Sequence, residues 1–159
     1  MTASPPRVVL DTVVFVQALI SGRGHAAGCV ERLRAGDCIL LSSNDTLDEL
    51  RDVSMRPKLR AKYPFLTDEK AAALIAEIES VAIVLPNPPS VISLPRDPKD
   101  EPFVDLAVAG AAQFIVTWNE RHLTYLMKQD TPEGRDFCTR FPNIRIVSPP
   151  DFLDALDRE

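Results

Sequence analysis

The feature that most constrains the fold is the alternation of short apolar runs with stretches of helical periodicity. Five short, mostly apolar runs occur along the chain, at residues 7–10, 38–41, 81–85, 114–117 and 144–147. Continuous apolar runs indicate strands that are buried on both faces, and strands joined by helices favour a parallel sheet. The sequence therefore predicts an α/β sandwich, in which two layers of helices enclose a central, mostly parallel five-stranded sheet.

The helices are predicted from apolar residues that recur every three or four positions and from capping residues at the helix ends. They are expected over 13–20 and 25–35, after 42–45, from Pro57, after Thr67, over 103–112 and 123–128, and after Ser148. Residues 86–102 hold six of the 14 prolines and are predicted to form a largely extended loop. Neither flank of this loop is large enough to fold alone, so we predict a single domain over residues 1–159.

Composition excludes several classes of protein. Apolar residues make up 45% and charged residues 26% of the chain, which are ordinary globular values. The net charge of −5 argues against a broad basic surface for nucleic acid, but not against an enzyme that gathers carboxylates around metal ions. No apolar stretch approaches the ~20 residues of a membrane span, and residues 1–7 show no signal-peptide pattern. Cys29, Cys38 and Cys138 form no metal or redox motif, so we expect a cytoplasmic protein with reduced thiols.

Acidic side chains gather where ligands bind in such sheets, at the carboxyl ends of the strands. Asp11 ends the first predicted strand, Glu49 lies on the helix after the second, and Asp97, Asp100 and Glu101 precede the helix that leads into the fourth. Carboxylates in one cleft raise one another's pKa unless a cation neutralises them. Mg²⁺ and Mn²⁺ prefer such oxygen ligands, and two such ions can promote phosphodiester cleavage.

Four segments, taken in order, resemble the PIN domain family. They read VVLDTVVFVQALIS, TLDEL, DPKDEPFVDLAVAGAAQFIVTWN and IVSPPDFLDAL. The resemblance runs from Arg7 to Leu156 and is closest to single-domain members that are toxins of toxin–antitoxin pairs. It implies a metal-dependent ribonuclease with three or four acidic residues in a cleft beside a parallel sheet.

The resemblance also assigns the site residue by residue. The first family acid falls on Asp11 and the second on Glu49. The third falls on Asp100 by the DxxD pattern, or on Glu101 by counting back from the fourth strand. The fourth, usually an aspartate, falls on Asn119, whose amide oxygen is a ligand without the charge. A second departure is Val13, where the family usually has asparagine.

Other side chains near these positions are candidates for substrate contacts, each with an ordinary alternative. Thr12 and Thr117 flank the first and fourth acid positions, and Trp118 is either a base-stacking residue or packing at the cleft rim. His122 follows the same turn. Asp97 fits a capping role. A basic cluster follows Glu49 and is either a solvated helix face or a phosphate contact; its members are Arg51, Arg56, Lys58, Arg60 and Lys62.

The leading hypothesis is an endoribonuclease that uses Mg²⁺ or Mn²⁺ held by Asp11, Glu49 and Asp100. The resemblance further implies a homodimer and a cognate antitoxin protein, which covers the cleft. The alternative is a weakly active or non-catalytic PIN module that binds RNA or a protein. Two phosphoryl-transfer classes are disfavoured, because Val13 replaces the second aspartate of a haloacid dehalogenase-type DxD, and Leu85-Pro86 replaces a receiver-domain aspartate.

Overall fold

The computed structural model describes residues 4–119, 121 and 123–158, and its centre is a five-stranded sheet. The strands follow the order β3-β2-β1-β4-β5, and all four pairings are parallel. Their bounds are β1 (Arg7–Leu10), β2 (Ile39–Ser42), β3 (Ile83–Val84), β4 (Phe114–Val116) and β5 (Arg145–Val147). The predicted five-stranded sheet is confirmed, and it is parallel throughout.

The strand order reverses at β1, which lies between β2 and β4 in the sheet. Leu10 pairs with Val116 at the carboxyl ends of β1 and β4. The Asp11 amide donates to the Val116 carbonyl (2.9 Å), so the chain stays fixed one residue beyond β1. Ligands in open α/β sheets bind at such a reversal, outside the carboxyl ends of the strands.

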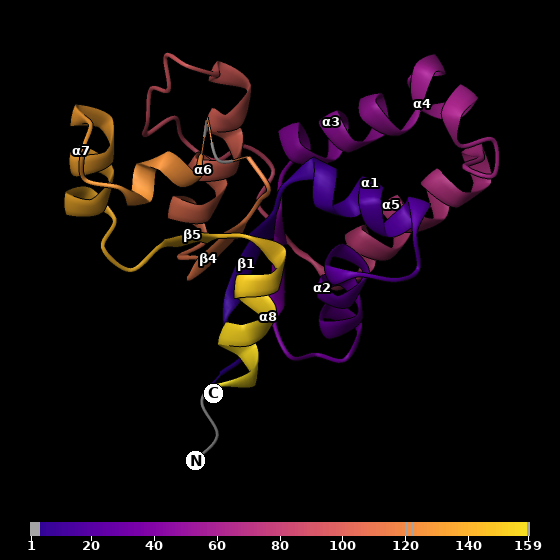
Figure 1. Cartoon of the computed structure of the whole chain (residues 1–159), viewed down its shortest axis with the longest axis horizontal. Coiled ribbons are helices and arrows are strands. Elements are labelled where there is room, and N and C mark those ends of the chain that lie inside the picture. Colours follow the sequence, from indigo (N-terminus) through magenta and orange to yellow (C-terminus); the bar gives the residue numbers. More distant parts are fainter. Residues whose placement is uncertain (1–3, 120, 122, 159) are drawn as a thin grey trace.

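The residues of β1 alternate between two cores, one on each face of the sheet. Val8 and Leu10 belong to one core, in which helices from both ends of the chain take part. These helices are α1 (Thr12–Ile20), α2 (His25–Arg34), α3 (Asn44–Ser54), α5 (Asp68–Val81) and α8 (Pro149–Asp157), with the short α4 (Pro57–Lys62) at the edge of this layer. Figure 1 shows α1, α3, α4 and α5 together on one side of the strands.

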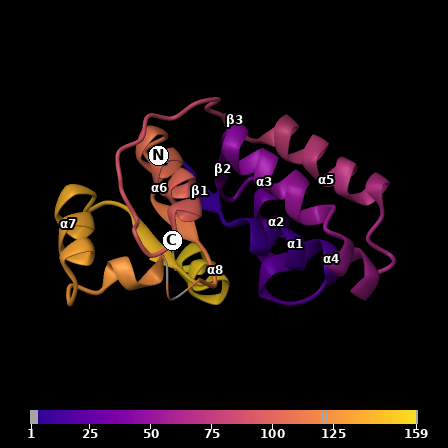
Figure 2. The same ribbon diagram turned by 90° about the horizontal axis from the view of Figure 1, so that it is seen from above.

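Val9 faces the opposite core, which it shares with Ile115 of β4. This second layer contains α6 (Glu101–Ala109), a 3₁₀ turn (Thr124–Met127) and α7 (Pro132–Arg140). Figure 2, the view from above, separates α6 and α7 from the layer of α1 to α5. The predicted α/β/α sandwich is therefore confirmed.

Several elements differ from the sequence prediction: the helix predicted over 123–128 is a short 3₁₀ turn, and the one predicted over 103–112 ends at Ala109. Helix α7 was not predicted, because its first turn contains Gly134 and few apolar residues mark its buried face; Thr131 caps it by accepting from the Gly134 amide (3.0 Å). Strand β3 is shorter than the predicted run over 81–85, because Val81 completes α5 instead.

The proline-rich segment is irregular only up to Asp97. A 3₁₀ helix η1 (Pro98–Asp100) follows, and α6 begins at Glu101 inside the predicted loop. Pro98 and Pro102 occupy the first turns of these two helices, where a missing amide hydrogen costs nothing. The prolines therefore mark two helix starts that bring Asp100 to the sheet.

No single helix among the described residues is long and apolar enough to cross a membrane. Helices α1 and α2 meet the length and composition requirement only as a pair, and they are bent by 99° relative to each other.

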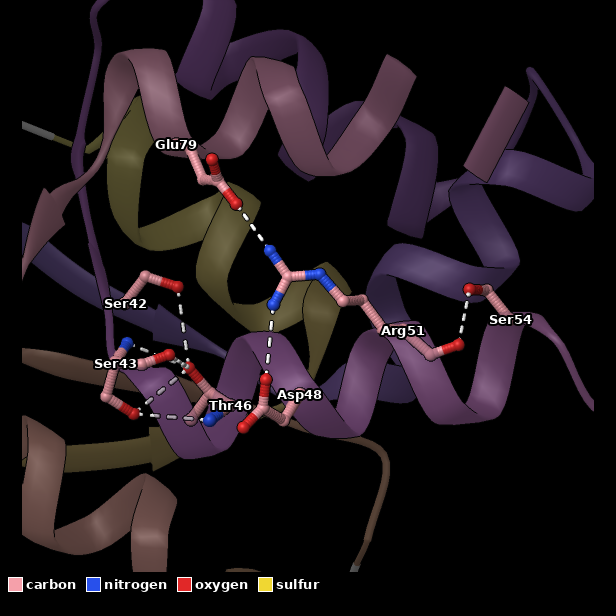
Figure 3. A network of polar contacts seen from close by, with 7 residues as sticks. All are labelled: Ser42, Ser43, Thr46, Asp48, Arg51, Ser54 and Glu79. Carbon is pink, nitrogen blue, oxygen red and sulfur yellow. Dashed lines mark hydrogen bonds and ion pairs between the residues drawn. The ribbon is translucent and has the colours of Figure 1, made fainter. Parts of the chain in front are cut away.

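Helix α3 is fixed at its start by a capping box (Figure 3). The Ser43 hydroxyl accepts from the Thr46 amide (3.2 Å), and the Thr46 hydroxyl accepts from the Ser43 amide (3.0 Å). Such reciprocal bonds satisfy amide groups that the first turn of a helix leaves without partners. The box fixes where α3 leaves β2, and so where Glu49, on the second turn, reaches the sheet edge.

Candidate active site

Asp11 lies directly beyond β1 and is only 7% exposed. Thr117 lies directly beyond β4, and its hydroxyl donates to Asp11 Oδ2 at 2.7 Å. The backbone amide of Asn119 donates to the Thr117 hydroxyl oxygen at 2.9 Å. Asp11 occupies the N-cap position of α1, yet its side chain makes no capping hydrogen bond. The carboxylate is thus held across the strand reversal by a residue from the neighbouring strand.

Glu49 approaches the same strand end from α3. The Thr12 hydroxyl donates to Glu49 Oε2 at 2.6 Å. Thr12 adjoins Asp11 in the chain and is itself buried, so this bond places the Glu49 carboxylate beside the Asp11 backbone. Glu49 is therefore hydrogen-bonded to the first turn of α1, although it lies 37 residues further along the chain than Thr12.

Asp100, at the end of η1, completes the group of acids. It is 7% exposed, and Asn119 Nδ2 donates to Asp100 Oδ2 at 3.1 Å. The neighbouring Glu101 points elsewhere, because its Oε1 accepts from the Leu94 amide (2.8 Å). Of the two candidates for the third acid, the structure brings Asp100 to the site and turns Glu101 towards the preceding loop.

Electrostatic repulsion links these three carboxyl groups. Burial is the largest cause that raises the pKa of Asp11, of Glu49 and of Asp100, the last from 3.8 to about 7. The charge of Asp11 raises the pKa of both other groups, and Glu49 raises that of Asp100. Asp97, which caps η1 by accepting from the Lys99 amide (3.1 Å), adds to the repulsion on Asp11 and Asp100.

The hydrogen bonds from the threonine hydroxyl groups lower the pKa values that burial and repulsion raise. Thr117 lowers the pKa of Asp11, and Thr12 lowers that of Glu49, because each stabilises the ionised form. Among the described residues, no ion pair joins Asp11, Glu49 or Asp100 to a basic side chain within 4.0 Å. Two buried acids, Asp11 and Asp100, and the half-buried Glu49 are therefore held by neutral donors, and none of them has a direct counter-ion in the part of the chain that is described.

The donor chemistry suits a hard divalent cation. Within the described ranges, no three His, Cys, Asp or Glu side chains are grouped closely enough to form a complete ligand set by themselves. Mg²⁺ does not need one, because it keeps several waters and is commonly held by one or two carboxylates. Asp11, Glu49 and Asp100 carry the oxygen donors that such an ion prefers, and a cation would relieve the repulsion that raises the pKa of Glu49 and of Asp100.

Cationic side chains flank the site on one side. A groove of about 280 Å³ lies between α3 and the start of α6, and its lining includes Glu49, Arg56 and Lys99. The charges of Arg56 and Lys99 both lower the pKa of Glu49, so both side chains face it. Arg56 also pairs with Asp52 (3.1 Å) on the exposed surface.

Arg51, which we predicted to contact substrate, is not brought to this groove. Its guanidinium donates to Asp48 (3.2 Å) and to Glu79 of α5 (2.6 Å), as Figure 3 shows. Residues two apart on a helix point in different directions, so Arg51 cannot share the face of Glu49. Its observed contact joins α3 to α5.

Trp118 lies next to Thr117 and Asn119 and is 41% exposed. Its indole Nε1 donates to Gln17 Oε1 of α1 at 2.6 Å. Val13, one turn earlier on α1, is 46% exposed, so the position where the family usually has asparagine is an apolar surface beside Asp11. His122 lies outside the described residues, and its predicted substrate contact stays a prediction.

Lys99 and Gln17 are the residues near the site that sequence reasoning missed. Lys99 stands inside the DPKDE segment, where the acidic neighbours drew attention away from it. Apart from Thr12 at its start, Gln17 is the polar residue of α1, and a polar residue in such an apolar helix is a signal that it has a partner. The partner itself, Trp118, is 101 residues away and could not be read from the sequence.

A parallel α/β sheet with acidic side chains at the strand reversal places oxygen donors where ligands bind in such folds. The sequence profile of the PIN domain matches residues 7–121, so the chain belongs to the PIN domain family. PIN domains are generally nucleases, and they typically use divalent metal ions. The chain is also 23% identical over 152 residues to an uncharacterized protein of Methanocaldococcus jannaschii, a match that covers 96% of this chain and 92% of the relative.

Because the pKa of Asp100 is raised, we predict that a substitution that removes its charge stabilises the protein at pH values where the carboxyl group is ionised. With a pKa of about 7 when folded and 3.8 when unfolded, Asp100 holds its proton more tightly in the folded state, so its ionisation destabilises the fold progressively above about pH 4 and fully above pH 7. Asp100→Asn should therefore raise the free energy of unfolding at pH 8 by about 1–3 kcal/mol, and change it little at pH 4. Urea denaturation in EDTA measures both values.

The matched control is Asp154→Asn, which removes an exposed carboxylate on α8. We expect this variant to match the wild type at both pH values. An Asp100→Asn protein that is equally stable, or less stable, at pH 8 would show that the carboxylate is not under electrostatic strain.

Proposed function

We propose that this protein is an endoribonuclease that requires Mg²⁺ or Mn²⁺, held by Asp11, Glu49 and Asp100. The observation that carries the proposal is the grouping of two buried carboxyl groups, Asp11 and Asp100, and the half-buried Glu49 at the strand reversal of a PIN domain, without an ion-pair partner among the described residues. Such an arrangement costs stability, and a bound cation offsets that cost.

A divalent cation at this site supplies charge neutralisation for the phosphate and a more acidic water for the attack. The chain's own residues hold the ligands in place. Thr117 fixes the Asp11 carboxylate, Thr12 fixes Glu49, and Asn119 orients Asp100 through its amide nitrogen. Hydrolysis in this manner leaves 5′-phosphate and 3′-hydroxyl ends.

A non-catalytic module that binds RNA or a protein is the second candidate. The observations that favour it are Asn119, which contributes an amide where the family usually has an acid, and the exposed apolar surface of Val13 beside Asp11. Loss of one formal charge weakens the binding of a hard cation, which is held mainly by charge and oxygen count. The two candidates therefore differ in how the site responds to added charge.

A metal titration of RNA cleavage separates them. Asn119→Asp adds the fourth carboxylate and should lower the Mg²⁺ or Mn²⁺ concentration for half-maximal cleavage, by about 10-fold or more, since changes in the groups around a metal typically shift affinity by ~10–100-fold. The side chain keeps its shape but loses the hydrogen bond that its amide nitrogen donates to Asp100, so thermal unfolding of the variant with and without the metal ion serves as the control for the fold. Asp11→Asn serves as the blank and should abolish cleavage in both backgrounds.

Each result of the titration has a definite reading. An unchanged midpoint for Asn119→Asp means that Asn119 is a turn residue and no ligand. Cleavage by Asn119→Asp alone, with none by the wild type, means that the natural protein is a binding module.

We further propose that Arg56 and Lys99 contact phosphates of the RNA along the groove beside Glu49. Lys99→Gln removes one cation there and should raise the KM for RNA several-fold at unchanged kcat, because a phosphate contact of this kind binds substrate and transition state alike. The salt dependence of binding should weaken by about 0.7 in the slope of log K against log salt concentration. Steady-state cleavage at several salt concentrations measures both.

Lys58→Gln is the matched control, because it removes the same charge from the exposed surface of α4, outside the groove. Equal effects of the two substitutions would point to the general charge of this surface and would contradict a contact at Lys99.

The resemblance to toxins also underlies a proposal about partners. We propose a homodimer and an antitoxin protein that covers the acids, with an arginine of the antitoxin placed against them, since arginine binds carboxylates through two hydrogen bonds. Light scattering at tens of micromolar should give twice the mass of the chain, 17.6 kDa. Co-expression with the neighbouring reading frame should yield a complex with reduced cleavage. A monomer, or a neighbour that does not co-purify, would overturn the corresponding half.

A further inference from the structure

Two residues of the candidate site come from separate segments of the chain that must be held together. Asp100 closes η1, at the end of the proline-rich loop, and Asn119 lies in the turn beyond β4. Asn119 Nδ2 donates to Asp100 Oδ2 at 3.1 Å. One such bond fixes the distance between two atoms. The orientation of the two segments depends on further contacts between them.

Arg96 makes contacts of this kind. It is an exposed residue directly before Asp97, whose side chain caps η1. Its guanidinium lies over the ring of Tyr125, with Cζ 4.1 Å from the ring centroid, and its Nη1 donates to the Arg121 carbonyl at 3.3 Å. Both partners belong to the segment beyond β4. Arg96 therefore joins the two segments outside the site itself.

Tyr125 is in turn fixed relative to Asn119. The amides of Leu123 and Thr124 both donate to the Asn119 carbonyl (3.1 Å each), and Tyr125 follows directly in the 3₁₀ turn. Tyr125 is 6% exposed and belongs to the core that also contains α6. Its ring is therefore a fixed surface, and Arg96 covers it.

The stack of Arg96 on Tyr125 closes a circuit of contacts. From Asp100 the circuit passes through Asn119 to Tyr125, across the stack to Arg96, and along η1 back to Asp100. The other cation–ring contacts in the described part of the chain are longer, at 4.8–5.6 Å. The buried hydroxyl of Tyr125 has no hydrogen-bond partner among the described residues, so the ring face carries this contact.

We propose that Arg96 is a positioning residue of the metal site. By stacking on Tyr125, it holds the segment of Asp100 at the spacing from Asn119 that a bound divalent cation requires. This inference rests on the proposed metal-dependent function and adds a residue to it. Within the described ranges, Arg96 forms no ion pair, so it positions Asp100 without neutralising the acids of the site.

The side-chain amide signal of Asn119 in a ¹H–¹⁵N NMR spectrum tests the spacing without metal, in EDTA. The signal is assigned by its loss in Asn119→Asp, and Asp100→Ala gives its position when the bond to Asp100 is absent. Arg96→Ala should move the signal most of the way towards that position, because the two segments separate. Arg96 is exposed, so this variant should keep the fold.

Calorimetric titration with Mn²⁺ then measures the effect on the proposed metal site. Arg96→Ala should weaken Mn²⁺ binding by about 2- to 30-fold, because the loss cannot exceed what a cation–ring contact contributes. Tyr125→Phe keeps the ring face and should bind as the wild type does. Tyr125→Leu removes the face and should match Arg96→Ala, and the double variant should lose no more than either single variant.

Arg140→Ala is the matched control. Arg140 lies over the ring of Phe141 at 4.8 Å, and its Nη2 donates to the Val91 carbonyl of the same loop at 2.8 Å. The substitution thus removes the same two kinds of contact outside the circuit. We expect it to leave both the Asn119 signal and the Mn²⁺ affinity unchanged.

An Asn119 signal that stays in place in Arg96→Ala overturns the proposal, and so does an unchanged Mn²⁺ affinity. Equal effects of Arg140→Ala also overturn it, because any loosening of the loop would then suffice. A wild type that binds no Mn²⁺ refutes the proposed metal dependence instead, and the Asn119 signal then decides by itself whether Arg96 sets the spacing.

Discussion

The structure of the site depends on one constraint, the placement of β1 in the middle of a parallel sheet. A strand with neighbours on both sides and helices on both faces can place polar residues only at its ends, and the carboxyl ends of parallel strands meet at one edge of the sheet. Asp11 stands at that edge, where the strand order reverses between β1 and β4. The amide of Asp11 still pairs with β4, so its carboxylate is fixed by the sheet before any side chain helps. The other acids are then brought to this point.

Neutral groups donate hydrogen bonds to all three acids: hydroxyl groups to Asp11 and Glu49, and the Asn119 side-chain amide to Asp100. Thr117 donates to Asp11, and Thr12 donates to Glu49, so each acid is oriented while its full charge remains. An arginine or lysine in the same place would orient the acids equally well but would neutralise them. The basic side chains Arg56 and Lys99 instead lie beside Glu49, in the groove between α3 and α6. Charge of opposite sign is therefore kept adjacent to the acids, in the groove beside Glu49.

The parallel sheet and the acid at the end of β1 could be predicted from the sequence. The directions of neighbouring side chains and their contacts with distant elements could not. Strand β1 and the placement of Asp11 at its end follow from a short apolar run that stops at an acid. The choice between Asp100 and Glu101 could not be made, because adjacent residues at a helix start differ only in direction, and the Leu94 amide that draws Glu101 away belongs to an irregular loop. Arg51 and Arg56 looked alike in the sequence, yet Glu79, from a different helix, holds only Arg51.

The unbalanced charge at the site also bears on the lifetime of the protein in a cell. Whatever binds the folded chain and not the unfolded one increases the folded fraction by mass action, and proteases act on the remainder. A cation bound among three acids that have no ion-pair partner in the described part of the chain would stabilise the folded state in this way. If divalent ions occupy the site as proposed, their supply governs turnover of the enzyme as well as its rate, so that a cell short of metal holds fewer molecules of it.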